Sequence, residues 1–167
     1  MKVLVTGATG FVGREVVRQL HKTAHSIRSL ARSRNASRVE EAVSCWGAEV
    51  HRGDVLDAAS LDGAVNGTEA IIHLVGIVAE VGESTFENVH TRGTGNLVTA
   101  AQQAKVRRFV HMSALGTRPS AASRYHQTKW AAEELVRHSG LDFTLFGLTP
   151  TSLREGIARY LGVKRET

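Results

Sequence analysis

The chain has 167 residues, of which 42% are hydrophobic and 22% are charged, and this is the length of one ordinary globular domain. The 16 glycines against two prolines exclude a proline-rich linker or a collagen-like repeat, and no apolar run approaches the roughly 20 residues of a membrane-spanning helix. The net charge is +5, but the basic residues form no long run and aromatic residues make up only 5%, so no nucleic-acid partner is expected.

The first half of the chain alternates short apolar segments with amphipathic ones. The amphipathic segments repeat their apolar residues at helical spacing, and the Asn66-Gly67 pair marks a turn. We expect strands at Lys2–Thr6, Ser26–Ala31 and Glu49–Arg52, and helices at Phe11–Lys22, Ala36–Trp46 and Ala58–Val65.

The second half continues the alternation. We expect strands at Ala70–Val75, Arg108–Met112 and Asp142–Phe146, and helices at Phe86–Ala104, Tyr125–His138 and Leu153–Leu161. The first of these strands is nearly all apolar, as expected when helices cover both faces of a sheet. Strands that alternate with helices predict an α/β fold, a doubly wound parallel sheet of about six strands with helices on both faces. One domain is expected over residues 1–148, followed by a short tail over residues 149–167 that holds one helix.

A glycine-rich loop separates the first strand from the first helix. Gly7, Gly10 and Gly13 follow the spacing Gly-x-x-Gly-x-x-Gly. The first glycine allows the tight turn, the second lets a pyrophosphate approach the backbone, and the third lets the helix pack on the sheet. The helix start then points N–H groups at the phosphates. The loop predicts a Rossmann-type dinucleotide site formed by Gly7, Thr9, Gly10, Phe11, Val12 and Gly13. The alternative is a glycine-rich turn without a ligand.

The end of the second strand decides which dinucleotide is bound. An acidic residue there would bind the adenosine hydroxyls and indicate NAD. This chain has Arg32, Ser33 and Arg34 instead. Arg32 can clamp a 2′-phosphate with Ser33 or Arg34 assisting, so NADP is predicted over NAD. The alternative is a solvated loop of arginines.

Asp54 and Val55 follow the third strand. The carboxylate can accept a hydrogen bond from the adenine amino group, beside the apolar side chain of Val55. The alternative for Asp54 is a helix N-cap or a loop role, both common for this residue type.

Tyr125 and Lys129 lie four residues apart on a predicted helix and therefore share one face. An ammonium beside a phenol favours the phenolate, which makes the tyrosine a usable acid or base. The lysine can also hold the nicotinamide ribose. Ser113 closes the fifth strand, at the carboxyl edge where ligands bind in open α/β folds. Alone, the Tyr125–Lys129 pair fits an exposed helix face, but the glycine loop and Ser113 favour a catalytic role.

These motifs together resemble the short-chain dehydrogenase/reductase superfamily, in its extended or atypical branch. The matching segments are Thr6–Gly13, Asp54–Val55, Ile71–Gly76, His111–Gly116 and Ser123–Phe146. The last two look most like NAD-dependent epimerase/dehydratase relatives, near the accessory dehydrogenase-like subunit of respiratory complex I.

The resemblance implies roles for individual residues. Leu74, Val75 and Gly76 would border the adenosine side of the cofactor. Tyr125 would be the general acid/base, Lys129 its electrostatic partner, and Ser113 the hydroxyl that orients a small-molecule substrate. Tyr125 and Lys129 would also contact the cofactor.

Two departures from the family bear on function. Members normally continue after the sixth strand with Arg-Pro, where this chain has Gly147-Leu148. Extended members also build the substrate pocket from a C-terminal lobe, most of which we expect to be missing here. The predicted function is an NADP-dependent oxidoreductase or epimerase/dehydratase, with a homodimer as one way to complete the pocket. The alternative is a non-catalytic accessory or redox-sensing module that binds the dinucleotide.

The remaining ionisable residues suggest structural roles. His21 and His25 have no further ligand in view, so no metal site is predicted. His73 and His111 are expected to be hydrogen-bonded residues of strands.

Cys45 and Glu133 complete the expectations. Cys45 lies beside Trp46 and is expected in the core; as the only cysteine it excludes an internal disulfide and indicates a reducing cytoplasm. Glu133 and Glu134 are expected on a helix surface.

Overall fold

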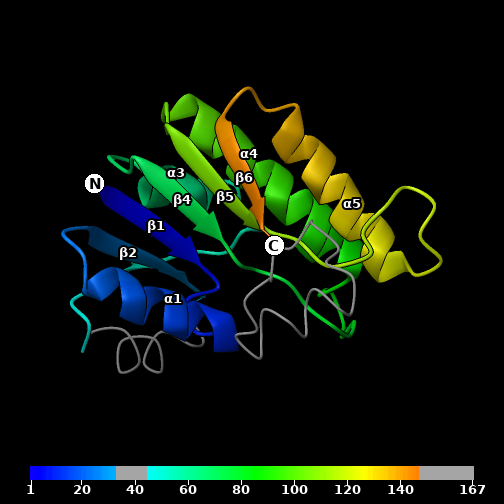
Figure 1. Ribbon diagram of the computed structural model, residues 1–167, viewed down its shortest axis with the longest axis horizontal. Helices are drawn as coiled ribbons and strands as arrows, with labels where there is room; N and C mark the ends of the chain where they lie inside the picture. Colours follow the sequence, from blue (N-terminus) through cyan, green and yellow to red (C-terminus); the bar gives the residue numbers. More distant parts are fainter. Residues whose placement is uncertain (33–44, 147–167) are drawn as a thin grey trace, which may run out of the picture.

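Six parallel strands form one sheet in the computed structural model of the chain, which describes residues 1–32 and 45–146. The strands are β1 (Lys2–Thr6), β2 (Ser26–Ala31), β3 (Glu49–Arg52), β4 (Ala70–His73), β5 (Arg108–Met112) and β6 (Asp142–Phe146). They pair in the order β3-β2-β1-β4-β5-β6, with β1 at the centre (Figure 1). This order confirms the predicted Rossmann-type sheet, and it places the reversal of strand order between β1 and β4.

The helices connect consecutive strands. They are α1 (Phe11–His21), α3 (Ala59–Val65), the π-helix η2 (Glu87–Arg92), α4 (Gly93–Gln103) and α5 (Arg124–Arg137). The expected helix at Ala36–Trp46 lies outside the described residues except for its last two, which form a turn. The expected helix at Leu153–Leu161, the tail over 149–167 and Gly147-Leu148 also lie outside them. None of the described helices is long and apolar enough to cross a membrane.

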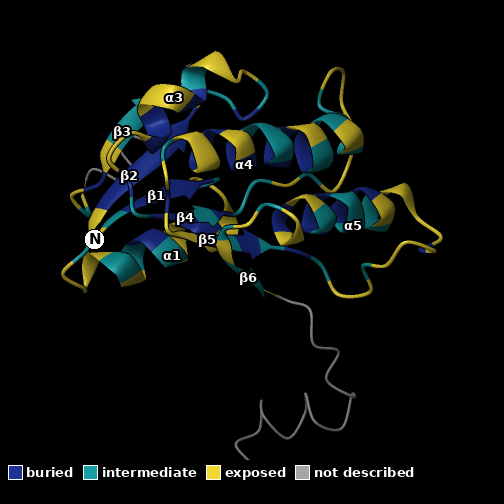
Figure 2. Cartoon of the chain, turned by 90° about the horizontal axis from the view of Figure 1, so that it is seen from above, coloured by how far each residue is buried: buried dark blue, intermediate teal, exposed yellow. Residues whose placement is uncertain are grey.

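Alternate residues of β1 pack against different helices because successive strand residues point to opposite faces of a sheet. Val3 and Val5 pack on one face with Val17 of α1. Leu4 packs on the other face, with residues of α3, α4 and α5. Figure 2 shows the strands as a buried layer between α1 on one side and α3 with α4 on the other. The helices therefore cover both faces, as predicted.

Two elements differ from expectation. The strand β4 ends at His73 rather than at Val75, and the next residues turn against the glycine loop: a Cβ on Gly7 would lie 3.0 Å from the carbonyl carbon of Leu74. The single helix expected over Phe86–Ala104 is a π-helical segment followed by an α-helix. Its wide turns bring Gly93 so close to the β3 side that a Cβ there would lie 2.9 Å from Val55. Such π-helical turns are rare and are frequently found at functional sites.

Candidate dinucleotide site and catalytic helix

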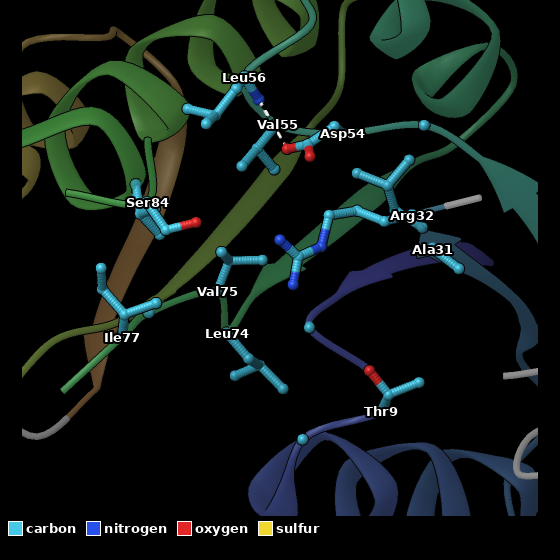
Figure 3. A pocket seen from close by; sticks show the side chains of 16 residues that line it. Thr9, Ala31, Arg32, Asp54, Val55, Leu56, Leu74, Val75, Ile77 and Ser84 are labelled. Atoms are coloured by element: carbon cyan, nitrogen blue, oxygen red, sulfur yellow. Dashed lines mark hydrogen bonds between the residues drawn. The ribbon is translucent and has the colours of Figure 1, made fainter. Parts of the chain in front are cut away.

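A cavity of about 300 Å³ opens at the carboxyl edge of the sheet where the strand order reverses (Figure 3). This is the place where open α/β sheets bind ligands. Its walls come from the loop after β1, from the ends of β2 and β3, and from the segment after β4. The predicted cofactor-binding residues that line it are Gly7, Thr9, Gly10, Arg32, Asp54, Val55, Leu74, Val75 and Gly76.

The glycine loop has the geometry that a phosphate site requires. Gly7 adopts the left-handed φ of 73°, and the Gly10 N–H donates to the Gly7 carbonyl at 3.0 Å. A Cβ on Gly13 would lie 2.1 Å from that same carbonyl oxygen, so only glycine lets α1 start this close to the turn. The helix begins with a glycine cap and has no acidic residue in its first turn, so its positive end is not compensated there.

Phe11 and Val12 open helix α1 and are exposed, Phe11 at 97%. With Gly13 they lie beside the cavity rather than among its lining residues, and their contact with a cofactor stays a prediction. A contact there would use the backbone N–H groups of the helix start.

Arg32 and Asp54 both line the upper part of the cavity (Figure 3). The Arg32 side chain extends into it, between Asp54 and Val75. The Asp54 carboxylate accepts a hydrogen bond from the Leu56 N–H at 3.0 Å, so it orders its own loop while it lines the cavity. Ser33 and Arg34, the other residues predicted to bind a 2′-phosphate, lie outside the described residues.

The three predicted catalytic residues come from the end of β5 and from α5. Lys129 is buried, 3% exposed, and its ammonium donates to the Met112 carbonyl at 2.5 Å. Ser113 is also buried, and its hydroxyl donates to the carboxylate of Glu133. Tyr125 is partly buried in the first turn of α5. Lys129 thus contacts Met112, the residue directly before Ser113, at the end of β5. Tyr125 lies one helical turn before Lys129 on α5.

Burial lowers the pKa of Lys129 from 10.5 to about 8, and the nearby charge of Glu133 opposes this lowering. The amine is therefore still mostly protonated at neutral pH. Lys129 lies one helical turn after Tyr125 on α5, and a nearby cation is what the predicted acid/base role of the tyrosine needs.

His90 was not among the predicted site residues, and it lies buried beside Tyr125. Its ring packs edge-to-face on the Tyr125 ring, with centroids 5.2 Å apart. The Nε2 atom lies 3.1 Å from the backbone N of Ile77, which lines the cavity, and Nδ1 lies 3.0 Å from the Thr128 hydroxyl. Burial lowers the pKa of His90 to about 4. The residue links the cavity wall to helix α5, and nothing in its local sequence indicates this.

Three expectations about structural residues need correction. Glu133 was expected on a helix surface but is fully buried. The sequence signal that it shares a helix face with Lys129 is their spacing of four residues. Cys45 is exposed rather than in the core. His73 is hydrogen-bonded as expected, to Thr6 and Thr94, but in the described part of the chain neither ring nitrogen of His111 has a hydrogen-bond partner.

A known protein family matches most of the chain. A family model described as NAD(P)H-binding matches residues 7–164. The chain belongs to this NAD(P)H-binding family. The glycine turn that a Cβ would fill fits such a dinucleotide, and so does the uncompensated helix end beside it.

Curated relatives of this NAD(P)H-binding chain have diverse names. It is 32% identical over 149 residues to the photosystem II assembly factor Ycf39 of Cyanophora paradoxa. The matched region covers 89% of this chain and 45% of that protein. It is 34% identical over 120 residues to a 3 beta-hydroxysteroid dehydrogenase/Delta 5-->4-isomerase of Mycobacterium tuberculosis, over 67% of this chain and 31% of that one. The chain therefore spans less than half the length of these relatives.

Solved structures place the chain in the predicted short-chain dehydrogenase/reductase superfamily. An NADPH-dependent quinone oxidoreductase of Escherichia coli, complexed with NADPH, is 26% identical with a TM-score of 0.71, over 87% of this chain and 48% of that one. A superfamily member of Agrobacterium tumefaciens with bound NAD is 28% identical with a TM-score of 0.67, over 87% and 48%. One of these two structures holds NADPH and the other holds NAD. The similarity therefore supports NAD(P) binding but does not choose between the two dinucleotides.

Proposed function

We propose that this chain binds NADP and acts as an oxidoreductase. In the proposed reaction Tyr125 moves a proton to or from a small carbonyl compound or alcohol. The observation that carries the proposal is the buried Lys129 ammonium, held on the same face of α5 as Tyr125 at the carboxyl edge of a dinucleotide-binding sheet. A bound nicotinamide supplies or accepts the hydride. The Tyr125 phenol would donate the proton to the substrate oxygen, or remove it in the reverse direction.

NADP is proposed over NAD because of Arg32. Its side chain extends into the cavity, and the residues directly after β2, Arg32 to Arg34, include no carboxylate to bind the ribose hydroxyls. A guanidinium is suited to a 2′-phosphate because it forms two parallel hydrogen bonds.

The cofactor choice is tested by titrating the purified chain with NADPH and with NADH, using nicotinamide fluorescence. We expect NADPH to bind more tightly. Arg32→Ala should weaken NADPH about ten-fold, as expected for one charge-assisted contact, and leave NADH unchanged. Equal affinities for the two dinucleotides would remove the NADP assignment, and binding of neither would remove the function itself.

The catalytic assignment is tested by Tyr125→Phe in a panel of ketones, quinones and nucleotide sugars. This change removes one hydroxyl and keeps the ring that packs on His90. Turnover should be lost while the dissociation constant for NADPH stays within about two-fold. Retained turnover would take Tyr125 out of the mechanism.

A non-catalytic accessory module is the second candidate, and one observation favours it. The Ser113 hydroxyl has a single proton and donates it to Glu133, so it is not presented to a substrate carbonyl in this arrangement. The photosystem II assembly factor shows that proteins named for assembly occur among the relatives. Bound NADPH that no compound of the panel oxidises would support this candidate.

The assembly state and the compartment remain proposals. A homodimer would supply a second chain to complete the substrate pocket. Light scattering at high concentration tests it, because a mass of 18.1 kDa would exclude the dimer. The single cysteine still favours a reducing cytoplasm.

A further inference from the structure

Glu133 is a fully buried carboxylate on the face of α5 that also carries Lys129. An ionised carboxylate in the interior requires partners that replace its water. It has two: the Ser113 hydroxyl donates to one oxygen, and the Arg137 guanidinium lies 3.4 Å from the other. Arg137 is partly exposed to solvent, so the hydrogen bond from Ser113 is the more deeply buried of the two contacts of Glu133.

Lys129 and Glu133 connect helix α5 to consecutive residues of β5. Lys129 donates to the carbonyl of Met112 at 2.5 Å, and Glu133 takes the hydroxyl of Ser113. The Ser113 N–H in turn donates to the Phe146 carbonyl at 3.0 Å and so continues the sheet to β6. Two adjacent points of the strand end thus fix the helix that carries Tyr125.

Four titratable groups interact electrostatically with Lys129, each from a different element. They are Glu133 on α5, His111 on β5, His73 on β4 and His90 on η2. Burial lowers the pKa of all three histidines, which leaves them neutral at pH 7. Among the described residues that act on the Lys129 amine, Glu133 is therefore the one that supplies negative charge.

We infer that Glu133 is a positioning residue, which holds the Ser113 hydroxyl and supplies the buried counter-charge for Lys129. Ser113 is then a link between strand and helix and does not donate to the substrate, because its only proton is used in this bond. The inference rests on the proposed function in one respect, since a fixed cation matters to catalysis only if Tyr125 is the acid/base.

Glu133→Gln tests the counter-charge because it removes the charge and keeps an oxygen that can accept from Ser113. In wild type the Lys129 amine should titrate near pH 8. In Glu133→Gln its midpoint should fall by about one pH unit, as expected for loss of a nearby opposite charge. The probe is carbon NMR of lysine labelled at Cε, with Lys129→Met to assign the signal. An unchanged midpoint would overturn the inference.

Glu134→Gln is the matched control. Glu134 is the next residue, is partly exposed and lies 3.4 Å from the Nε of Arg137. This change should leave the Lys129 midpoint and the NADPH affinity unchanged. Glu133→Asp keeps the charge on a shorter side chain and replaces Glu133→Gln if that variant does not fold. Its midpoint should stay near the wild-type value, and a fall as large as that predicted for glutamine would contradict the counter-charge role.

Ser113→Ala tests the role of the hydroxyl. We expect Ser113→Ala to lower the urea midpoint of unfolding, because the buried Glu133 carboxylate loses its hydroxyl donor. An unchanged midpoint together with a 100-fold or larger loss of turnover would show that Ser113 acts on the substrate and would overturn this part, since such losses are typical of removing a transition-state donor. The NMR titration needs no substrate, so failure of the proposed function leaves the test of Glu133 intact.

Discussion

The two sides of the strand-order reversal are built differently. On the side of β1, β2 and α1, glycines and the Arg32 side chain line the cavity, and the neighbouring core of Val3, Val5 and Val17 is apolar. Arg28 is buried on this side and donates to backbone carbonyls. On the side of β4, β5 and α5, ionisable side chains are buried: His73, His90, His111, Lys129 and Glu133. The first side depends on steric fit, and the second depends on which groups carry protons.

The largest effect should come from breaking the steric fit of the first side. Gly13→Ala would place a Cβ 2.1 Å from the Gly7 carbonyl oxygen. We expect the free energy of unfolding to fall by about 3 kcal/mol or more and NADPH binding to be lost. Gly95→Ala is the control, since its Cβ would meet Leu135 at an ordinary 3.5 Å. Urea denaturation compares the two, and an unaffected Gly13→Ala would refute the close-packing argument.

We expect the buried histidines of the second side to make the free energy of unfolding fall in acid. The pKa of His73 is lowered to about 3 and that of His90 to about 4, with that of His111 also well below 6.5. The unfolded chain therefore binds more protons than the folded one between pH 6.5 and about 4. Stability is present above pH 6.5 and is lost as pH falls, with a slope approaching about 1.4 kcal/mol per pH unit for each histidine. Urea denaturation from pH 7.5 to 4.5 measures this slope, and a flat profile would contradict it.

Two matched substitutions distinguish the contributions of His73 and His111 to stability. His73→Leu leaves the hydroxyls of Thr6 and Thr94 without their ring partner, at a cost of about 1–3 kcal/mol. His111→Leu removes a buried ring that makes no hydrogen bond in the described structure, so stability at pH 7 should rise by about 1 kcal/mol. Both should reduce the acid slope. A destabilised His111→Leu would mean that its ring nitrogens have partners after all.

The smallest effect should come from a charge pair on the surface of the second side. Arg108 lies 2.6 Å from Asp142, and both side chains are largely exposed. Asp142→Asn should change the free energy of unfolding by less than about 1 kcal/mol, and salt should reduce the difference further. A larger effect would show that exposed charges contribute to this side as much as the buried ones.

The sheet was predictable because its signals are local. Five of the six strands have the bounds expected from short apolar segments closed by turn residues. The strand β4 was expected to be two residues longer because Leu74 and Val75 are apolar. They are apolar for another reason, since they line the cavity. Periodicity alone cannot separate these two uses of an apolar side chain.

The lining of the cavity was predictable from spacing and topology, while the contact between Ser113 and Glu133 was not. Glycine spacing and the ends of parallel strands place Gly7, Arg32 and Asp54 together without any tertiary information. The bond between Ser113 and Glu133 joins residues 20 positions apart, and it depends on how α5 is rotated on the sheet. Only the spacing from Lys129 to Glu133 carried a hint of it.

The central place of β1 has a consequence for how the protein is made. Its register pairs Val3 with Ala70 of β4, so β1 completes its pairing only after β4 has been synthesised. Parallel strands joined across helices fold slowly, and incomplete chains expose unpaired apolar edges. Until β4 has formed, the apolar residues of Lys2–Thr6 therefore lie in a strand with one unpaired edge.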